Sequence, residues 1–245
     1  MIELEVCANS VASCIAARTG GAHRIELCAG LPEGGLTPSY GYTEIALNHC
    51  DLPIFPIIRP RGGDFLYDEY ELDQMQYDIE YFYELGVAGF VFGALTRGGE
   101  LDLAANARLI EAADGKPCTL HRAFDMVRDP LKSLDEAVRL GFSRILTSGG
   151  AATALEGVDV LKELVRAAGD RITIMAGSGV RPENALEIVT KSGVPALHGT
   201  LQTAYDSDMI YRNGRISLGG SDGESEYLMK VTDARKVRAL LEQFR

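Results

Sequence analysis

The sequence lacks the features that would place the chain in a membrane or outside the cell. No apolar run approaches the about 18 residues that a transmembrane helix needs. The N-terminal segment, residues 1–5, has neither the positive region nor the apolar region of a secretory signal. The five cysteines are odd in number and form no Cys-x-x-Cys pair, so no disulfide framework is indicated. We therefore expect a cytoplasmic protein with reduced thiols.

Positive charge is also scarce. The 245 residues include 24 lysines and arginines against 35 aspartates and glutamates, which gives a formal net charge of −11. That balance leaves no large basic surface, so neither nucleic acid nor an anionic membrane is an expected partner. Hydrophobic residues make up 46% of the chain and charged residues 24%, which is ordinary for a globular protein. No linker or low-complexity run divides the chain, and we expect one domain over residues 1–245.

Short apolar runs recur along the chain, each followed by a helical pattern, at intervals of roughly 30 residues. Strands that alternate with helices predict parallel pairing, and eight such units in a chain of this length predict a (β/α)8 TIM barrel. An open doubly wound sheet is the alternative, but the first strand is not followed by the glycine-rich turn typical of that fold. The predicted strands begin near Ile2, Arg24, Ile54, Gly89, Cys118, Arg144, Ile172 and Ala196.

The helical segments have clear boundaries. Apolar residues spaced three or four apart predict a helix from Glu69 that ends before Gly86. Further helices are predicted to begin at Asp129-Pro130 and Arg181-Pro182, and a last one spans 234–244. Before this last helix, residues 210–212 and 215–217 flank Asn213-Gly214, a pattern typical of a two-residue hairpin turn. We therefore expect a hairpin-like tail ahead of the last helix.

Side chains alternate between the two faces of each predicted strand. The aliphatic members must face the helices, so the other face points into the barrel. Near the carboxyl ends of the strands this inward face is polar. Two interpretations stay open: an ion-pair network that fills the barrel, or a functional site at its mouth. The inward set comprises Glu5, Cys7, Arg24, Glu26, Cys28, Arg59, Thr119, His121 and His198.

Seven segments, among them His121-Arg122-Ala123-Phe124-Asp125, resemble the CutC family of copper homeostasis proteins. The resemblance implies a TIM barrel, a cytoplasmic location, copper binding and assembly into a homodimer or larger homo-oligomer. It also implies that Cys7 and Cys28 are the copper ligands. Soft thiolates suit Cu(I), and inward thiols on neighbouring strands can share one ion, with His121 as an additional ligand candidate. The segments are 5–7, 24–29, 33–39, 58–65, 91–96, 121–125 and 146–149.

A second functional hypothesis is a barrel enzyme, such as a lyase, isomerase or hydrolase, that acts on a small anionic or phosphorylated metabolite. The loops after the seventh and eighth strands are glycine-rich, as phosphate-binding loops of TIM barrels often are. Under this hypothesis the anion would be bound by Arg59, Arg61, Ser148, Gly177, Gly179, His198 and Gly199. The catalytic residues would be Glu5, Glu26, Arg59 and His121.

Overall fold

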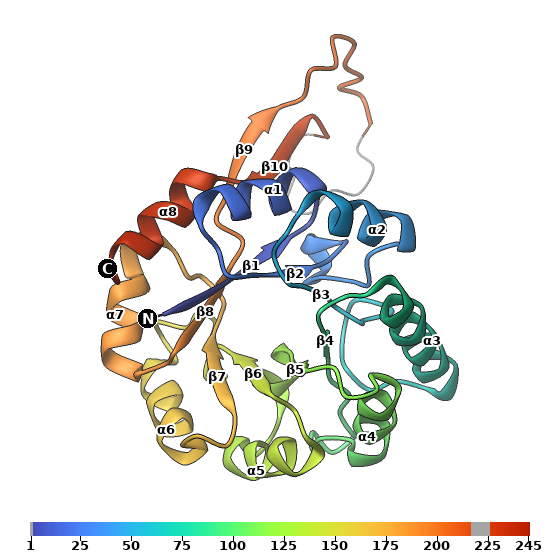
Figure 1. The fold of residues 1–245 in the computed structure, drawn as a ribbon, viewed down its shortest axis with the longest axis vertical. Coiled ribbons are helices and arrows are strands. Elements are labelled where there is room, and N and C mark those ends of the chain that lie inside the picture. The colour runs from blue at the N-terminus through green and yellow to red at the C-terminus, as the bar shows by residue number, and fades with distance from the viewer. Residues whose placement is uncertain (1, 217–225) are drawn as a thin grey trace.

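Eight parallel strands form a barrel inside a ring of helices in this computed structural model, which describes residues 2–216 and 226–245 (Figure 1). The strand order is β3-β2-β1-β8-β7-β6-β5-β4. A parallel bridge between Ile57 and Val91 joins the two end strands and closes the ring. The predicted TIM barrel is therefore confirmed, and every strand begins within one residue of its predicted start. The strands are β1 Glu3–Ala8, β2 Arg24–Leu27, β3 Ile54–Pro56, β4 Phe90–Phe92, β5 Cys118–Leu120, β6 Arg144–Thr147, β7 Thr173–Ala176 and β8 Ala196–Gly199.

The helices begin and end where capping chemistry dictates. Asp68 accepts a hydrogen bond from the Glu71 N–H while Glu71 accepts one from the Asp68 N–H, which begins α3 with a capping box. Gly86 ends that helix with a φ of 83°, a conformation that glycine adopts without strain. No helix in the described ranges has the length and hydropathy of a membrane span. The helices are α1 Val11–Gly20, α2 Tyr40–His49, α3 Glu69–Leu85, α4 Leu103–Ala112, α5 Pro130–Leu140, α6 Val158–Ala168, α7 Pro182–Ser192 and α8 Ala234–Glu242, with short 3-10 helices η1 Leu31–Glu33 and η2 Arg122–Met126.

Strand alternation produces two separate apolar layers. The outward side chains, such as Leu4 and Ile25, join the large core between the barrel and the helices. The inward apolar side chains form two smaller clusters inside the barrel, one with Cys7 and Cys28 and the other around Met175. The inward positions that remain are polar and charged. These positions carry the candidate site.

The tail contains a hairpin, but its strands are not the predicted ones. β9, Gln202–Asp206, pairs antiparallel with β10, Leu228–Thr232, and the pair projects beyond the helical ring beside α1 (Figure 1). The prediction of strands on either side of Asn213-Gly214 is wrong for residues 210–216, which form no strand; Ser217 lies outside the described residues. The Arg212 guanidinium instead donates two hydrogen bonds to the Asp206 carboxylate. These bonds connect the segment to the end of β9 through side chains and not through strand pairing.

Candidate functional site

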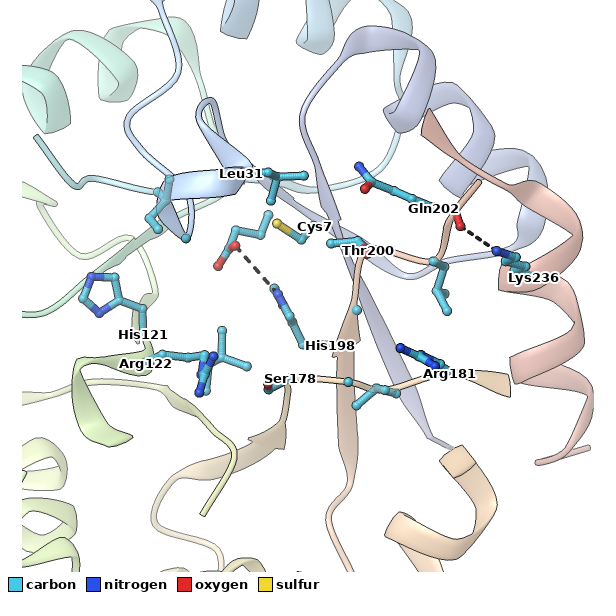
Figure 2. A pocket seen from close by; sticks show the side chains of 18 of the residues that line it. Cys7, Leu31, His121, Arg122, Ser178, Arg181, His198, Thr200, Gln202 and Lys236 are labelled. Carbon is cyan, nitrogen blue, oxygen red and sulfur yellow. Dashed lines mark hydrogen bonds and ion pairs between the residues drawn. The ribbon is translucent and has the colours of Figure 1, made fainter. Parts of the chain in front are cut away.

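A cavity of about 740 Å³ opens at the carboxyl ends of the barrel strands (Figure 2). This end of a TIM barrel normally carries the functional site, because loops from all eight strands meet there. Side chains from the strands form its base, and residues from α8 and from the loops after β2, β3, β5, β7 and β8 form its wall. The charged and titratable residues that line it are Cys7, Glu26, Arg59, His121, Arg122, Arg181, Glu183, His198 and Lys236.

Below the cavity, Glu5 lies at the centre of a buried charge network. The register places Glu5 beside Arg24 on β2 and His198 on β8. One carboxylate oxygen lies 2.5 Å from Arg24 Nε, and the other accepts a hydrogen bond from His198 Nδ1 at 2.7 Å. The Arg24 guanidinium also contacts the Thr119 hydroxyl at 3.4 Å across the barrel. The inward parity inferred from the sequence therefore brings these four groups together.

The charge state of Glu5 follows from these partners. Burial raises its pKa, but Arg24 and the hydrogen bond from His198 outweigh burial and lower the pKa from 4.5 to about 2. Glu5 is therefore ionised at neutral pH although it is fully buried. Its charge is compensated within the barrel, so Glu5 supports the site from below and does not line the cavity.

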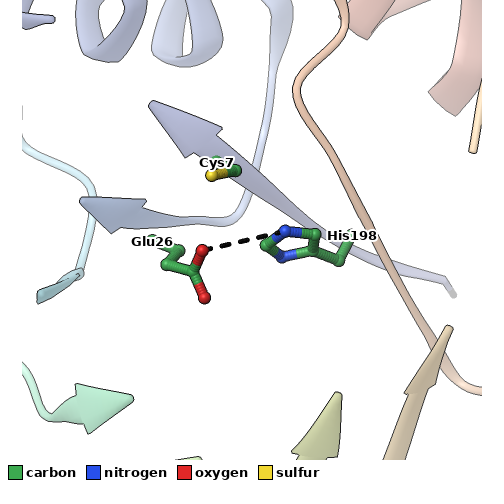
Figure 3. Close-up of side chains that lie close together, drawn as sticks. All are labelled: Cys7, Glu26 and His198. Carbon is green, nitrogen blue, oxygen red and sulfur yellow. Dashed lines mark ion pairs between the residues drawn. The ribbon is translucent and has the colours of Figure 1, made fainter. Parts of the chain in front are cut away.

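One level higher, Cys7, Glu26 and His198 converge at the base of the cavity (Figure 3). One donor atom from each lies within 4.8 Å of the others, and His198 Nε2 is 3.8 Å from a Glu26 oxygen. Burial raises the pKa of Glu26 against the opposing charge of His198. Burial lowers the pKa of His198, but Glu26 and Glu5 outweigh it and raise that pKa. Glu26 and His198 therefore hold a proton between them more readily than isolated side chains would.

The two predicted metal ligands are in contact. The Sγ atoms of Cys7 and Cys28 are 3.4 Å apart, far more than the roughly 2.05 Å of a disulfide. The hydrogen bond with Cys28, burial and nearby Glu26 together raise the pKa of Cys7 well above its ordinary value. Cys7 lines the cavity, whereas Cys28 is fully buried behind it. The other cysteines, Cys14, Cys50 and Cys118, pack in the outer core.

On the opposite wall, His121 lines the cavity and has one buried nitrogen without a hydrogen-bond partner among the described residues. Its Nδ1 accepts a hydrogen bond from the Ala123 N–H at 3.3 Å, so the neutral ring carries its proton on Nε2. Burial and the positive charge of Arg59 lower the pKa of His121 to about 3, which keeps the ring neutral. The buried Nε2 has no hydrogen-bond partner in the part of the chain that the structure describes. The sequence suggested His121 as a third metal ligand, but the histidine that lies with Cys7 and Glu26 is His198.

Arg59 is buried, and its guanidinium is hydrogen-bonded to backbone carbonyl groups. It donates to the carbonyl oxygens of Glu33, Gly35 and Gly63 at 2.6, 3.1 and 2.8 Å. These bonds join the loop after β2 to the loop after β3. Arg59 therefore shapes one wall of the cavity and contributes a positive charge that no carboxylate pairs with in the described ranges.

The predicted anion-binding residues are divided between the cavity and its surroundings. Gly179, His198 and Gly199 line the cavity, whereas Arg61, Ser148 and Gly177 do not. Arg61 pairs with Glu71 at 2.5 Å, and the Ser148 hydroxyl donates to the Ala151 carbonyl. A Cβ on Gly177 would lie 2.5 Å from a Leu146 methyl carbon, so close packing accounts for this glycine.

Several lining residues were missed by the sequence analysis. They come from the segments after β5, β7 and β8, from the start of β9 and from α8, outside the barrel strands whose alternation indicates direction. The available signal was position, since Arg122 and Arg181 lie in the segments between a barrel strand and the next long helix. The missed polar residues are Arg122, Ser178, Arg181, Thr200, Gln202 and Lys236.

Comparison with known proteins identifies the family. The sequence model of the CutC family matches residues 2–203. The chain belongs to the CutC family. A CutC family protein from Bacteroides thetaiotaomicron is 48% identical over 96% of this chain and 95% of its own length. The human copper homeostasis protein cutC homolog is 45% identical over 97% of this chain and 87% of its own length.

A solved CutC structure agrees with the fold. The crystal structure of a candidate copper homeostasis protein CutC from Streptococcus agalactiae has a TM-score of 0.78 and 39% identity. It covers 82% of this chain and 99% of its own. The CutC family match ends within β9, so β10 and α8 lie beyond it.

Proposed function

We propose that the chain is a cytoplasmic copper-binding protein that serves copper homeostasis, and that Cys7 and Cys28 bind one Cu(I) ion. The observation that carries the proposal is the contact between two buried thiols, 3.4 Å apart, one of which opens onto the cavity. Thiolates are the ligands that Cu(I) prefers, and two sulfur atoms in contact can bind the same ion. The names of the mouse and human relatives, copper homeostasis protein cutC homologs, support the same role.

The surroundings of the thiols also fit a metal site. His198 Nε2 and a Glu26 oxygen lie with Cys7 Sγ inside one cluster, so a third donor is within reach. His198 donates from Nδ1 to Glu5, which fixes the orientation of its ring. Metal-binding histidines usually have such a carboxylate partner on the other ring nitrogen. In this arrangement Glu5 and Arg24 would hold the ligand set in place without touching the ion.

A Cu(I) titration over a range of pH tests this proposal. Because the pKa of Cys7 is raised, its thiol is protonated at neutral pH, and binding of copper as a thiolate complex must release a proton. The apparent affinity should then rise about tenfold per pH unit for each proton released. We expect one Cu(I) per chain when the protein competes anaerobically with a chromophoric chelator. Binding of several ions per chain would indicate nonspecific thiol chemistry, and binding of one ion with no dependence on pH would exclude a thiolate that forms from a protonated thiol; either result would contradict the proposal.

A further inference from the structure

The wall of the cavity reverses the charge balance of the chain. Overall, acidic residues outnumber basic ones by 35 to 24. The charged residues that line the cavity are four cations, Arg59, Arg122, Arg181 and Lys236, and two acids, Glu26 and Glu183. A cluster of cations in a concave site within an acidic protein concentrates anions there. Binding of Cu(I) at the base does not explain these cations on the wall, because positively charged side chains do not attract a positive ion.

Two of these cations are free to bind a ligand. Neither Arg181 nor Lys236 forms an ion pair with any other described residue, whereas Arg122 is bound to Asp125 at 2.7 Å. Among the described residues, the Lys236 ammonium group donates only to the Gln202 carbonyl, at 2.6 Å. Figure 2 shows Arg181 and Lys236 on the same side of the cavity, with Thr200 nearby. Arg181 directly precedes α7, whose N-terminus also favours a negative charge.

The opposite side of the cavity has unpaired polar atoms of another kind. His121 Nε2 is a buried donor, and one Glu26 oxygen is a buried acceptor, and neither has a partner in the described ranges. Both side chains are more than nine-tenths buried and line the cavity. Buried polar groups are nearly always hydrogen-bonded, so unpaired ones at a cavity indicate a ligand that supplies the partners. A hydroxyl group can accept from His121 and donate to Glu26.

The size of the cavity selects an organic molecule over a simple ion. Sites for small molecules have volumes of about 300–1,000 Å³, and this cavity of about 740 Å³ is within that range. An inorganic anion at Arg181 and Lys236 would leave His121 and Glu26 unpaired. A molecule with an anionic group at one end and hydroxyl groups at the other would satisfy both sides.

We propose that the cavity binds a small organic phosphate, with its phosphate group between Arg181 and Lys236 and its hydroxyl groups at His121 and Glu26. Two unpaired cations of different geometry, the α7 N-terminus and the Thr200 hydroxyl together suit a dianion with several acceptor oxygens better than a single carboxylate. The phosphate end of this site does not include the thiols, whereas its hydroxyl end shares Glu26 with the cluster around Cys7. Lys236 lies outside the residues that the CutC family model matches. The site gives the chain a small-molecule function besides copper binding.

Calorimetric titration of the copper-free protein at low salt tests the proposal, with inorganic phosphate, glycerol 3-phosphate, glycerol and malonate as probes. We expect one glycerol 3-phosphate per chain, bound more tightly than inorganic phosphate, and no binding of glycerol. Arg181→Ala and Lys236→Ala should each weaken both phosphates about tenfold, because each removes a charge-assisted hydrogen bond. Arg238→Ala is the matched control: it removes a positive charge from the same helix, where Arg238 donates to the Thr19 carbonyl and does not line the cavity.

A further variant separates the two ends of the ligand. His121→Asn keeps an acceptor for the Ala123 N–H and removes the Nε2 donor, so it should weaken glycerol 3-phosphate but not inorganic phosphate. Cys7→Ala should retain phosphate binding, which keeps this proposal independent of the copper site. Absence of phosphate binding would overturn the proposal, as would an equal loss in Arg238→Ala. Tighter binding of malonate through the same two cations would overturn the choice of phosphate. Two cation variants in separate parts of the fold, one just before α7 and one on α8, keep the test decisive if one fails to fold.

Discussion

Replacing either Cys7 or Cys28 by alanine is expected to lower the Cu(I) affinity of the protein by more than about 100-fold. Loss of a group that only orients a metal ligand typically costs about 10- to 100-fold in affinity, so loss of a thiolate that binds the ion directly should cost more. The thiols are 3.4 Å apart, so removing one leaves the other with no second sulfur beside it in the described ranges. Competition with a Cu(I) chelator under anaerobic conditions measures the effect.

The chain supplies a matched control for this experiment. Cys118 is also a buried strand cysteine, but it packs in the outer core on the helix side of β5. Burial raises its pKa to about 12, so this thiol too is protonated at neutral pH. Cys118→Ala should keep the wild-type affinity. If Cys118→Ala loses copper as strongly as Cys7→Ala, or if neither loses it, the thiol pair is not the site.

Removing the charge of Glu5 is expected to cost the protein about 3–5 kcal/mol of unfolding free energy. Glu5→Gln keeps the shape of the side chain but leaves the buried Arg24 guanidinium without a counter-charge. The lowered pKa of Glu5, about 2 against an ordinary 4.5, corresponds to roughly 3 kcal/mol, which agrees with that cost. Denaturant unfolding of the two proteins at neutral pH measures the difference.

The ion pair between Glu5 and Arg24 also predicts that the unfolding free energy depends on pH. A lowered pKa in the folded state means that the stabilisation by Glu5 is fully present above about pH 4.5 and is lost as the pH falls toward about 2. The difference between wild type and Glu5→Gln should shrink over that window. Glu187→Gln is the control, because its partner Lys191 is exposed and surface pairs contribute about 1 kcal/mol or less. Equal destabilisation by the two variants would show that the Glu5 network does not stabilise the barrel.

Strand positions and inward parity could be predicted from the sequence because both depend on a local period of two. Aliphatic residues such as Leu4 and Val6 mark the helix-facing side, and the polar residues between them must then face the barrel. The close approach of Glu5 to Arg24 and His198 follows from that parity once the strands are in register. The homodimer or larger assembly implied by the family resemblance stays a prediction.

The sequence could not show which hydrogen-bond or ion-pair partner each polar side chain would have. Arg59 has the parity of an inward residue, yet its guanidinium turns to three carbonyl oxygens in neighbouring loops. Lys236 lines the cavity although it lies on α8, far along the chain from the last barrel strand, and no local sequence pattern predicts that position. The Asn213-Gly214 signal failed because a turn sequence favours a hairpin without securing it: an isolated two-stranded hairpin is marginally stable in water, and Arg212 binds the Asp206 carboxylate instead.

The central claim, that Cys7 and Cys28 form the copper site at the base of the barrel cavity, is tested most directly by anomalous diffraction at the copper edge. Crystals of the protein loaded with one equivalent of Cu(I) should show one strong peak, located between the two Sγ atoms and next to His198. A single peak elsewhere, for example beside Cys14 and Cys50 in the outer core, or no peak in protein that retains its copper in solution, would contradict the account.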